Sequence, residues 1–238
     1  MIKYVSYLML VLLFSCTSAE IQQTLGGILE SGDTKPTTNE VISGLKDALI
    51  KGTNTGTAQA SKLDGYFKNP NIKIPFPPEI TNVETKLRQI GLGGEVDKFV
   101  KSLNRGAEQA AKEAAPIFVN AIRSLTIQDA WGILRGENDA ATRYLERTSS
   151  GELYTKFKPV VDKSLKKVNA TKYYSDLAGT YNKIPFVTKV NADLGDYATN
   201  KAIDGLFYLV EQEEAKIRED PIARTTDILK KVFGYSGD

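Results

Sequence analysis

The strongest constraint on the fold is a run of apolar residues at helical spacing between positions 95 and 114. At about 100° per residue, these side chains share one stripe that covers under a third of a helix surface. Alanine occupies the second half of this stripe, which we call the alanine stripe. Such small side chains let a neighbouring helix approach closely. The pattern predicts a long helix in an all-α, multi-helix bundle. The stripe comprises Val96, Phe99, Val100, Leu103, Ala107, Ala110, Ala111 and Ala114.

A second strong pattern lies near the C-terminus, where residues 202–210 are apolar on nearly every side of a helix except at Asp204. Such a helix is typical of the centre of a bundle. It belongs to a predicted helix over residues 192–219. Asp220 and Pro221 then have the residue types of an N-cap and a first helical position, so the sequence predicts that a final helix begins at Pro221.

Shorter helices account for most of the remaining chain. Thr126 and Asp129 form the capping pattern of one of them, and Asn138 or Asp139 is the expected N-cap of another. Pro116 is expected to kink or restart the helix that carries the alanine stripe. The predicted helices cover residues 39–62, 79–90, 95–114, 117–122, 126–136, 140–147, 151–168, 171–181, 192–219 and 221–234.

Residues 66–78 interrupt the helical pattern. Four prolines and an alternation of Ile72 with Ile74 predict an extended crossing segment here. Its aromatic residues either line an apolar groove for a lipid or peptide or plug one end of the bundle. The motif Lys-Ile-Pro-Phe occurs at 73–76 and again at 183–186, but the flanking residues do not align well enough to establish a duplication.

The first twenty residues have the layout of a bacterial export signal. Lys3 precedes an apolar run that is about half as long as a membrane span. Residues 13–16, Leu-Phe-Ser-Cys, resemble a lipobox, in which the signal is removed before a lipidated cysteine. We therefore expect residues 1–15 to be a signal peptide and Cys16 to carry the lipid. The alternative is an ordinary signal cleaved after Ala19.

The expected order after the signal is a tether and one domain. Residues 16–38 are polar and are interpreted as a flexible tether, and residues 39–235 as a single all-helical domain. The whole chain has 31 basic and 29 acidic residues. This balance argues against nucleic acid as a partner, because phosphate backbones attract basic surfaces. We expect a protein of the cell envelope, lipid-anchored in a membrane and facing the periplasm, or else soluble in the periplasm.

The chain contains no histidine and a single cysteine. The lack of histidine excludes a Ser-His-Asp triad and an HExxH zinc site. The single cysteine excludes an internal disulfide and leaves no ligand set typical of structural zinc. We predict no metal, no cofactor and no catalytic residue, and any catalysis would depend on carboxylates, Lys, Tyr, Ser or Thr.

Two polar clusters are candidates for a ligand pocket. The first lies on the helix of the alanine stripe, where the alternatives are a solvated face or one ion pair between neighbouring turns. The second lies near the end of the chain, where the alternative is a set of helix-end ion pairs. The candidates are Asn104, Arg105 and Glu108 in the first cluster and Glu214, Arg218 and Arg224 in the second.

Asp204 is a further candidate, because it interrupts the most apolar run of the chain. A buried carboxylate costs several kcal/mol unless it is paired or protonated. We therefore expect Asp204 to be buried with a partner, either a tyrosine hydroxyl or an arginine such as Arg143. In that position it would serve either as a structural hydrogen-bonding group or as the acid of a functional site.

Several short motifs resemble, in combination, the bacterial domain-of-unknown-function family 4197. The resemblance covers about residues 40–234 and implies an all-helical envelope protein, often behind a signal or lipoprotein sequence. It brings no established activity and no site residues. One departure is Gly106, where the family pattern more often has Ala. The motifs are residues 44–49, 72–75, 104–108, 140–142, 204–207, 217–221, 224–225 and 232–234.

Three functions are compatible with these patterns. The first is a non-catalytic binding or interaction module whose partner is an envelope protein. The second is a helical carrier for an apolar ligand, which requires a roomy apolar cavity. The third is a carboxylate-based enzyme without histidine, which requires at least two carboxylates in one cleft. We predict the first, because the chain lacks both histidine and a nucleophile motif.

Overall fold

The computed structural model describes residues 36–167, 169–183, 185, 186, 189, 191, 193–220, 222, 224 and 226–234. The predicted signal, Cys16 and nearly all of the predicted tether lie outside these residues, so the structure does not test those predictions. None of the helices formed by the described residues combines the length and the apolar character needed to cross a membrane.

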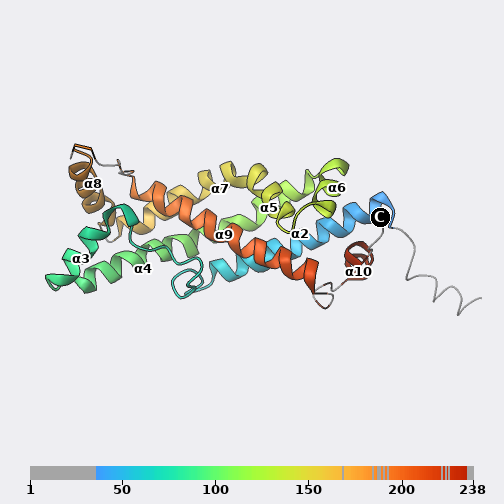
Figure 1. The fold of residues 1–238 in the computed structure, drawn as a ribbon, viewed down its shortest axis with the longest axis horizontal. Helices are drawn as coiled ribbons and strands as arrows, with labels where there is room; N and C mark the ends of the chain where they lie inside the picture. The colour runs from blue at the N-terminus through green and yellow to red at the C-terminus, as the bar shows by residue number, and fades with distance from the viewer. Residues whose placement is uncertain are drawn as a thin grey trace, which may run out of the picture.

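Four long helical rods dominate the described part of the chain and run along its length (Figure 1). The rods are α2 (Thr38–Ser61), α4 (Gly93–Ala110) with α5 (Ala114–Arg123), α7 (Ala140–Lys166) and α9 (Leu194–Glu219). The most extensive contacts join α2 to α9, α4 to α7 and α7 to α9. No strand occurs among the described residues, so the prediction of an all-α, multi-helix fold is confirmed.

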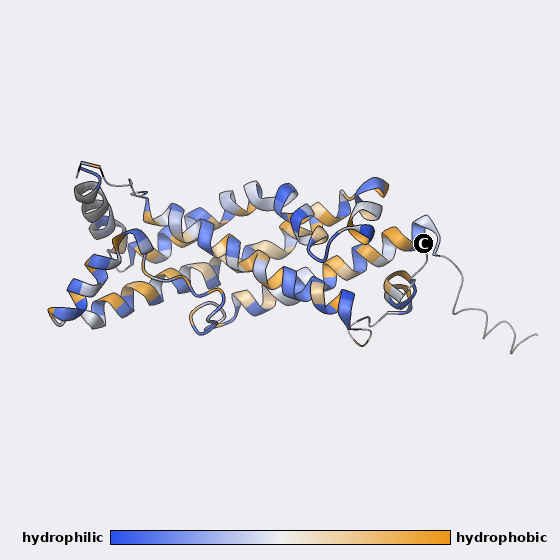
Figure 2. Ribbon diagram, viewed as in Figure 1, coloured by the Kyte–Doolittle hydropathy of each residue, from blue (hydrophilic) through white to orange (hydrophobic). Residues whose placement is uncertain are grey.

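The shorter elements lie mostly at the two ends of the rods. They are η2 (Pro78–Ile80), α3 (Thr81–Gln89), η3 (Ala111–Glu113), α6 (Ile127–Arg135), α8 (Ala170–Tyr181) and α10 (Asp227–Gly234). The helices α3 and α8 lie at one end, and α6 and α10 lie at the other (Figure 1). Apolar and hydrophilic residues are interspersed along each rod (Figure 2), as expected for helices that bury one face.

The alanine stripe forms a close contact between the rods. Seven of its eight residues are buried, and Phe99 is half-buried. A Cβ added to Gly106 would lie 3.3 Å from the Cβ of Ser164, so α4 approaches α7 as closely as the small residues allow. The rod breaks at η3 and restarts as α5 two residues before Pro116, so the predicted restart is confirmed.

Two predicted helices, 140–147 and 151–168, are one continuous helix in the structure, α7, so their separation was wrong. Between them, the hydroxyls of Ser149 and Ser150 donate to carbonyl oxygens four residues earlier, at 2.5 and 2.6 Å. Packing of α7 against α4 and α9 along its length outweighs the cost of Gly151, about 1 kcal/mol.

The final helix starts later than the sequence predicted. Asp220 is the C-cap of α9 rather than an N-cap, and its N–H donates to the carbonyl of Lys216 at 2.9 Å. The final helix, α10, begins only at Asp227, although it ends at Gly234 as predicted. The error arises because proline disfavours the helical conformation of the residue before it. A residue in that position can therefore end the preceding helix as readily as it can cap the following one.

Capping boxes begin α6 and α2. The predicted box of Thr126 and Asp129 on α6 is confirmed. The sequence analysis did not identify the box of Thr37 and Glu40 on α2. Glu40 also accepts a hydrogen bond from Lys231 of α10 at 2.7 Å, and these contacts with Lys231 and Thr37 hold the pKa of Glu40 at about 2.

Residues 66–78, the predicted extended segment, form turns between 66 and 72 and have no regular structure from 73 to 77, so the predicted extended conformation does not hold over the first part. From 71 to 76, alternate side chains of the segment are buried in the core and the others are exposed. Tyr66, Ile74 and Phe76 are buried, which favours core packing over an open aromatic groove. The Tyr66 hydroxyl donates to the carbonyl of Ala202 at 2.5 Å, and burial raises the pKa of Tyr66 far above its usual range. In the second Lys-Ile-Pro-Phe copy Phe186 is fully exposed, so the two copies have different structural roles.

Gly205 lets α9 pack directly on this segment. A Cβ at this position would lie 2.8 Å from Cε1 of Tyr66 and 3.0 Å from the Cβ of Ile72. We predict that Gly205→Ala lowers the free energy of unfolding by about 1–3 kcal/mol, because the buried ring and branched side chain must shift. Urea denaturation of the purified protein measures this change.

Gly132→Ala is the matched control, because nothing lies within 4 Å of the corresponding Cβ on the exposed side of α6. This change should raise the free energy of unfolding by about 0.5–1 kcal/mol through helix propensity. Equal effects of the two substitutions would contradict the close contact at Gly205.

Candidate functional site

Asn104 pairs with the backbone of the extended segment. Its side-chain oxygen accepts from the N–H of Ile74, and its amide nitrogen donates to the carbonyl of Ile74, both at 2.8 Å. The same nitrogen donates to the carbonyl of Val100 at 2.8 Å. Asn104 is fully buried, so its amide satisfies backbone groups that no water reaches.

Glu108 binds the same segment one turn further along α4. Its Oε1 accepts from the N–H groups of Tyr66 and Phe67, both at 3.2 Å. Its Oε2 accepts from Arg105, which also donates to Asp64 at 2.6 Å. Glu108 is only 4% exposed, so this carboxylate is desolvated and fully engaged by hydrogen-bond donors.

Asp64 completes this cluster from a turn that the sequence analysis did not identify. Its φ of 66° lies in the left-handed region, which aspartate tolerates better than most residues. Lys68 and Arg105 hold the pKa of the Asp64 carboxyl below its usual range. The structure thus brings Asn104, Arg105 and Glu108 together, and it confirms the Arg105–Glu108 ion pair while showing that Asn104 and Glu108 are not on a solvated face.

Glu214 caps a helix other than its own. Its Oε1 accepts from the N–H of Ala141 at 3.0 Å, and its Oε2 accepts from the N–H and hydroxyl of Thr142, both at 2.8 Å. These residues begin α7, where the unpaired N–H groups and the helix dipole favour an anion. Asp139 is the N-cap residue of α7, as the sequence predicted, but its side chain makes no capping hydrogen bond, and Glu214 accepts from the first N–H groups in its place.

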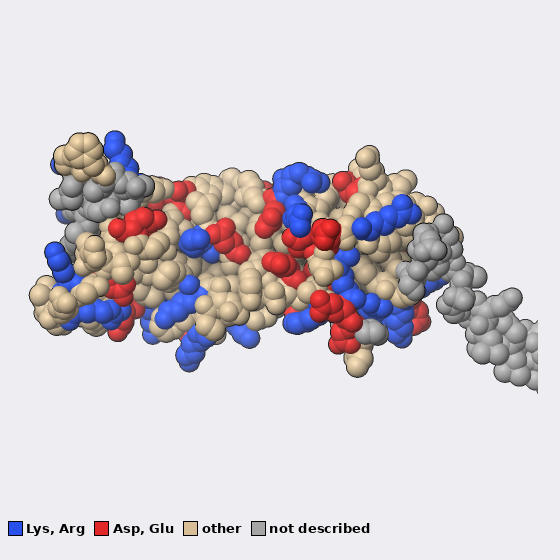
Figure 3. Space-filling model, viewed as in Figure 1, with Lys and Arg blue, Asp and Glu red and all other residues tan. Residues whose placement is uncertain are grey.

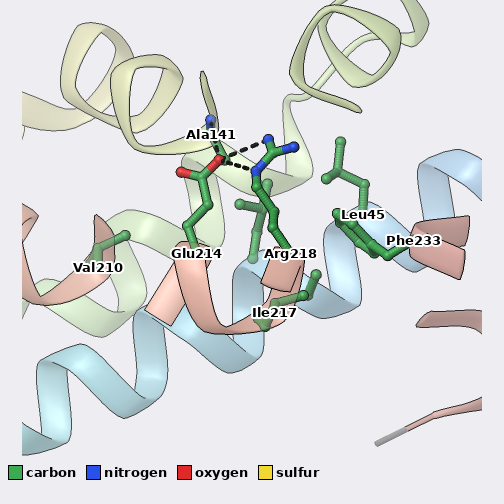
Figure 4. Close-up of a pocket in the computed structure, with 9 residues that line it drawn as sticks. Leu45, Ala141, Val210, Glu214, Ile217, Arg218 and Phe233 are labelled. Carbon is green, nitrogen blue, oxygen red and sulfur yellow. Dashed lines mark hydrogen bonds and ion pairs between the residues drawn. The ribbon is translucent and has the colours of Figure 1, made fainter. Parts of the chain in front are cut away.

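Arg218 links this carboxylate to a third helix. It donates to Glu214 Oε1 from Nε and Nη2, at 2.9 and 2.8 Å (Figure 4). Its Nη2 also donates to the carbonyl of Ile133 at 2.8 Å. Ile133 lies in the last turn of α6, where a cation meets the negative end of the helix. The predicted helix-end ion pair is present, and it joins α6, α7 and α9.

Arg224 lies outside this ion pair. It donates to the carbonyls of Ile217 and Arg218, at 3.0 and 2.6 Å, and so satisfies the last turn of α9. Its role is to tie the chain after α9 back to that helix.

Asp204 is exposed, so the prediction of a buried carboxylate is wrong. Its side chain is 63% exposed and pairs with Lys201 at 3.0 Å. The expected partner Arg143 pairs with Asp139 instead. The residues on either side of Asp204 are buried. Asp204 therefore lies on a narrow solvent-exposed side of α9, although its neighbours in the sequence belong to the core.

The carboxylates of the sequence prediction do not converge. Glu108 binds the extended segment, Glu214 binds the start of α7, and Asp204 pairs with Lys201 at the surface. Within the described residues, no group of three or more acidic or cysteine side chains is arranged to hold a metal ion. Glu108, Asp204 and Glu214 therefore provide no pair of carboxylates in one cleft for acid–base chemistry.

The pocket beside Glu214 is apolar and small. Its volume is about 20 Å³, and its walls come from α2, α7, α9 and α10 (Figure 4). A cavity of this size holds about one water molecule. Sites for organic ligands are usually 300–1,000 Å³. This pocket is therefore too small for the apolar ligand that a carrier would require.

A much larger groove lies beside Arg105, with a volume of about 710 Å³. We call it the basic groove. Its lining contains four basic residues and one acidic residue, whereas the face in Figure 3 shows both signs of charge interspersed. This composition makes it the best candidate for a binding site. It is lined by Ser61, Leu63, Arg105, Glu108, Gln109, Lys112, Pro159, Val160, Lys163, Ser164 and Lys167.

Sequence reasoning identified Arg105 and Glu108 but missed the lysines of the basic groove. Lys163 and Lys167 are four residues apart, which places them on one face of a helix. That spacing is a readable signal, but nothing in the sequence shows that this face borders α4. The pairing of Thr142 with Glu214 was missed for the same reason, since the two residues are 72 positions apart.

Comparison with known proteins identifies a family. A family described as "Protein of unknown function (DUF4197)" matches residues 35–234. This range contains the basic groove and both buried ion-pair clusters. No curated protein and no solved structure matches the chain.

Breaking the Glu214 contact tests the structural role of the second cluster. We predict that Glu214→Gln lowers the free energy of unfolding by about 3 kcal/mol or more, because Arg218 is left buried without its charge partner. Chemical denaturation measures the change. Glu211→Gln is the control on an exposed position of the same helix and should change stability by less than about 0.5 kcal/mol. Similar values for both variants would refute the role of Glu214 as the cap of α7.

Proposed function

This chain belongs to the DUF4197 family, and on that premise we propose that it is a lipid-anchored binding module of the bacterial cell envelope. The observation that supports the binding role is the basic groove, a site large enough for a ligand, whose charged lining residues are four basic and one acidic. The anchor rests on the lipobox-like residues 13–16 and on Cys16.

The tether supports this arrangement. Residues 16–36 would reach at most about 70 Å when fully extended, and as a flexible chain about 25 Å on average. Since α2 starts directly after Thr37, this length would hold the bundle near a membrane and leave its surfaces free to meet a ligand or partner.

The state of the carboxylates favours binding over catalysis. Glu108 and Glu214 already accept hydrogen bonds from backbone N–H groups and from an arginine. A general acid or base must exchange its proton with a substrate, and these two groups would have to abandon structural contacts to do so. The carrier alternative finds little support in an apolar pocket of about 20 Å³.

Cell fractionation tests the anchor. We predict that Cys16→Ala moves the protein from the membrane fraction to the soluble fraction or blocks its processing, because the attachment site for the lipid is lost. Intact-mass measurement of the wild-type protein should show an acylated N-terminal cysteine.

Ser18→Ala is the matched control and should leave both the membrane fraction and the lipid mass unchanged. A wild-type protein that starts at Glu20 would contradict the anchor and support cleavage after Ala19. Unchanged membrane association of Cys16→Ala would contradict the anchor as well.

A further inference from the structure

We propose that the basic groove binds a phosphate-bearing ligand. This inference rests on the binding role proposed above and names its ligand class. The groove lies where the last turns of α4 and the following η3 border the second half of α7. Its titratable lining residues are Arg105, Glu108, Lys112, Lys163 and Lys167.

Two rows of side chains line the groove. Arg105 and Gln109 of α4 are followed by Lys112 of η3 at spacings of four and three residues, and Lys163 of α7 is followed four residues later by Lys167, the C-cap of that helix. Such spacings put the residues of each row on one face of a helix. Because α4 and α7 contact each other extensively, both rows border the same volume.

The lysines carry positive charge that the protein does not neutralise. Glu108 and Asp64 already pair with Arg105. Lys163 and Lys167 form no hydrogen bond or ion pair among the described residues, and Lys112 contacts only the neutral amide oxygen of Gln109, at 3.0 Å. Like charges four residues apart on a helix repel each other, so a bound anion would relieve this repulsion.

The type of cation favours phosphate as the recognised group. A guanidinium binds carboxylates through two parallel hydrogen bonds, but the guanidinium of Arg105 is already occupied. The remaining cations are three ammonium groups, which act as separate point charges around one volume. A phosphate distributes its charge over several oxygens and can meet more than one of them.

The walls of the groove also suit an organic part on the ligand. Leu63 is 75% exposed at the rim, and Pro159 and Val160 line the wall that α7 provides. A volume of about 710 Å³ lies within the range of ligand sites. The phosphate could therefore belong to a soluble compound or to a lipid headgroup, and the experiment must separate these sources.

Calorimetric titration with inorganic pyrophosphate tests the proposal. The full chain carrying Cys16→Ala is used near 0.15 M salt, where charges outside the groove are largely screened. We expect the parent protein to bind pyrophosphate and the pair Lys163→Glu with Lys167→Glu to bind at least tenfold more weakly. The milder pair Lys163→Gln with Lys167→Gln should give a smaller loss, and it replaces the first if charge reversal prevents folding.

The matched control reverses two lysines outside the groove, Lys86→Glu and Lys172→Glu. Both are exposed and form no ion pair among the described residues. This pair causes the same change in net charge and should alter the dissociation constant by less than twofold. Equal weakening by control and groove variants would overturn the proposal, because general charge would then explain binding.

Vesicle sedimentation separates the two sources of phosphate. Vesicles of phosphatidylcholine alone are compared with vesicles that also contain phosphatidylglycerol. Sedimentation that requires phosphatidylglycerol and is lost on reversal of Lys163 and Lys167 assigns the ligand to a lipid headgroup. Binding of pyrophosphate without this sedimentation assigns it to a soluble compound. Failure to bind either probe overturns the ligand class, while the fate of the anchor is decided separately by fractionation.

Discussion

The rest of the fold depends on the pairing of α4 with the backbone of the extended segment. This segment cannot form a helix because of its prolines, yet Tyr66 and Ile74 lie fully inside the core. Buried N–H and C=O groups without partners cost free energy. Asn104 and Glu108 supply those partners from successive turns of α4. They therefore allow a non-helical segment to pack against the helical bundle with alternate side chains buried in its core.

The second ion pair applies the same principle to helix ends. Glu214 satisfies the first N–H groups of α7, and Arg218 satisfies a carbonyl in the last turn of α6. In both clusters, charged side chains form hydrogen bonds with buried backbone groups, and their role is structural. The lysines of the basic groove differ, because the side chains of Lys163 and Lys167 have no hydrogen-bond or ion-pair partner in the part of the chain that the structure describes. This contrast is the physical basis for placing function at the groove and not at the carboxylates.

Periodicity and capping patterns were sufficient to predict the helices, since both depend on residues close in sequence. The alanine stripe and the Thr126 cap both follow from local chemistry. The predicted helix over 79–90 also ends close to its predicted end, as α3, just before Gly91, whose positive φ of 87° is typical of a helix end. The start of the final helix was wrong for a local reason, since Asp220 before a proline can end one helix or cap the next, but two other errors have non-local causes. Asp204 is exposed because of how α9 is oriented among its neighbours, and α7 is continuous because other helices pack along it. The polar residues at positions 104 and 108 were recognised as candidates, but their partners lie 30 and 42 positions away.

Native-state hydrogen exchange of the backbone amides tests most directly whether α4 holds the extended segment in the core. The account predicts that the N–H groups of Ile74, Tyr66 and Phe67 exchange as slowly as the central amides of α9, through global unfolding. The amide of Asn71, which is hydrogen-bonded at the exposed surface of the same segment, should exchange much faster and serves as the internal reference. Fast exchange of all four amides would show that the segment opens independently of the bundle and would contradict the account.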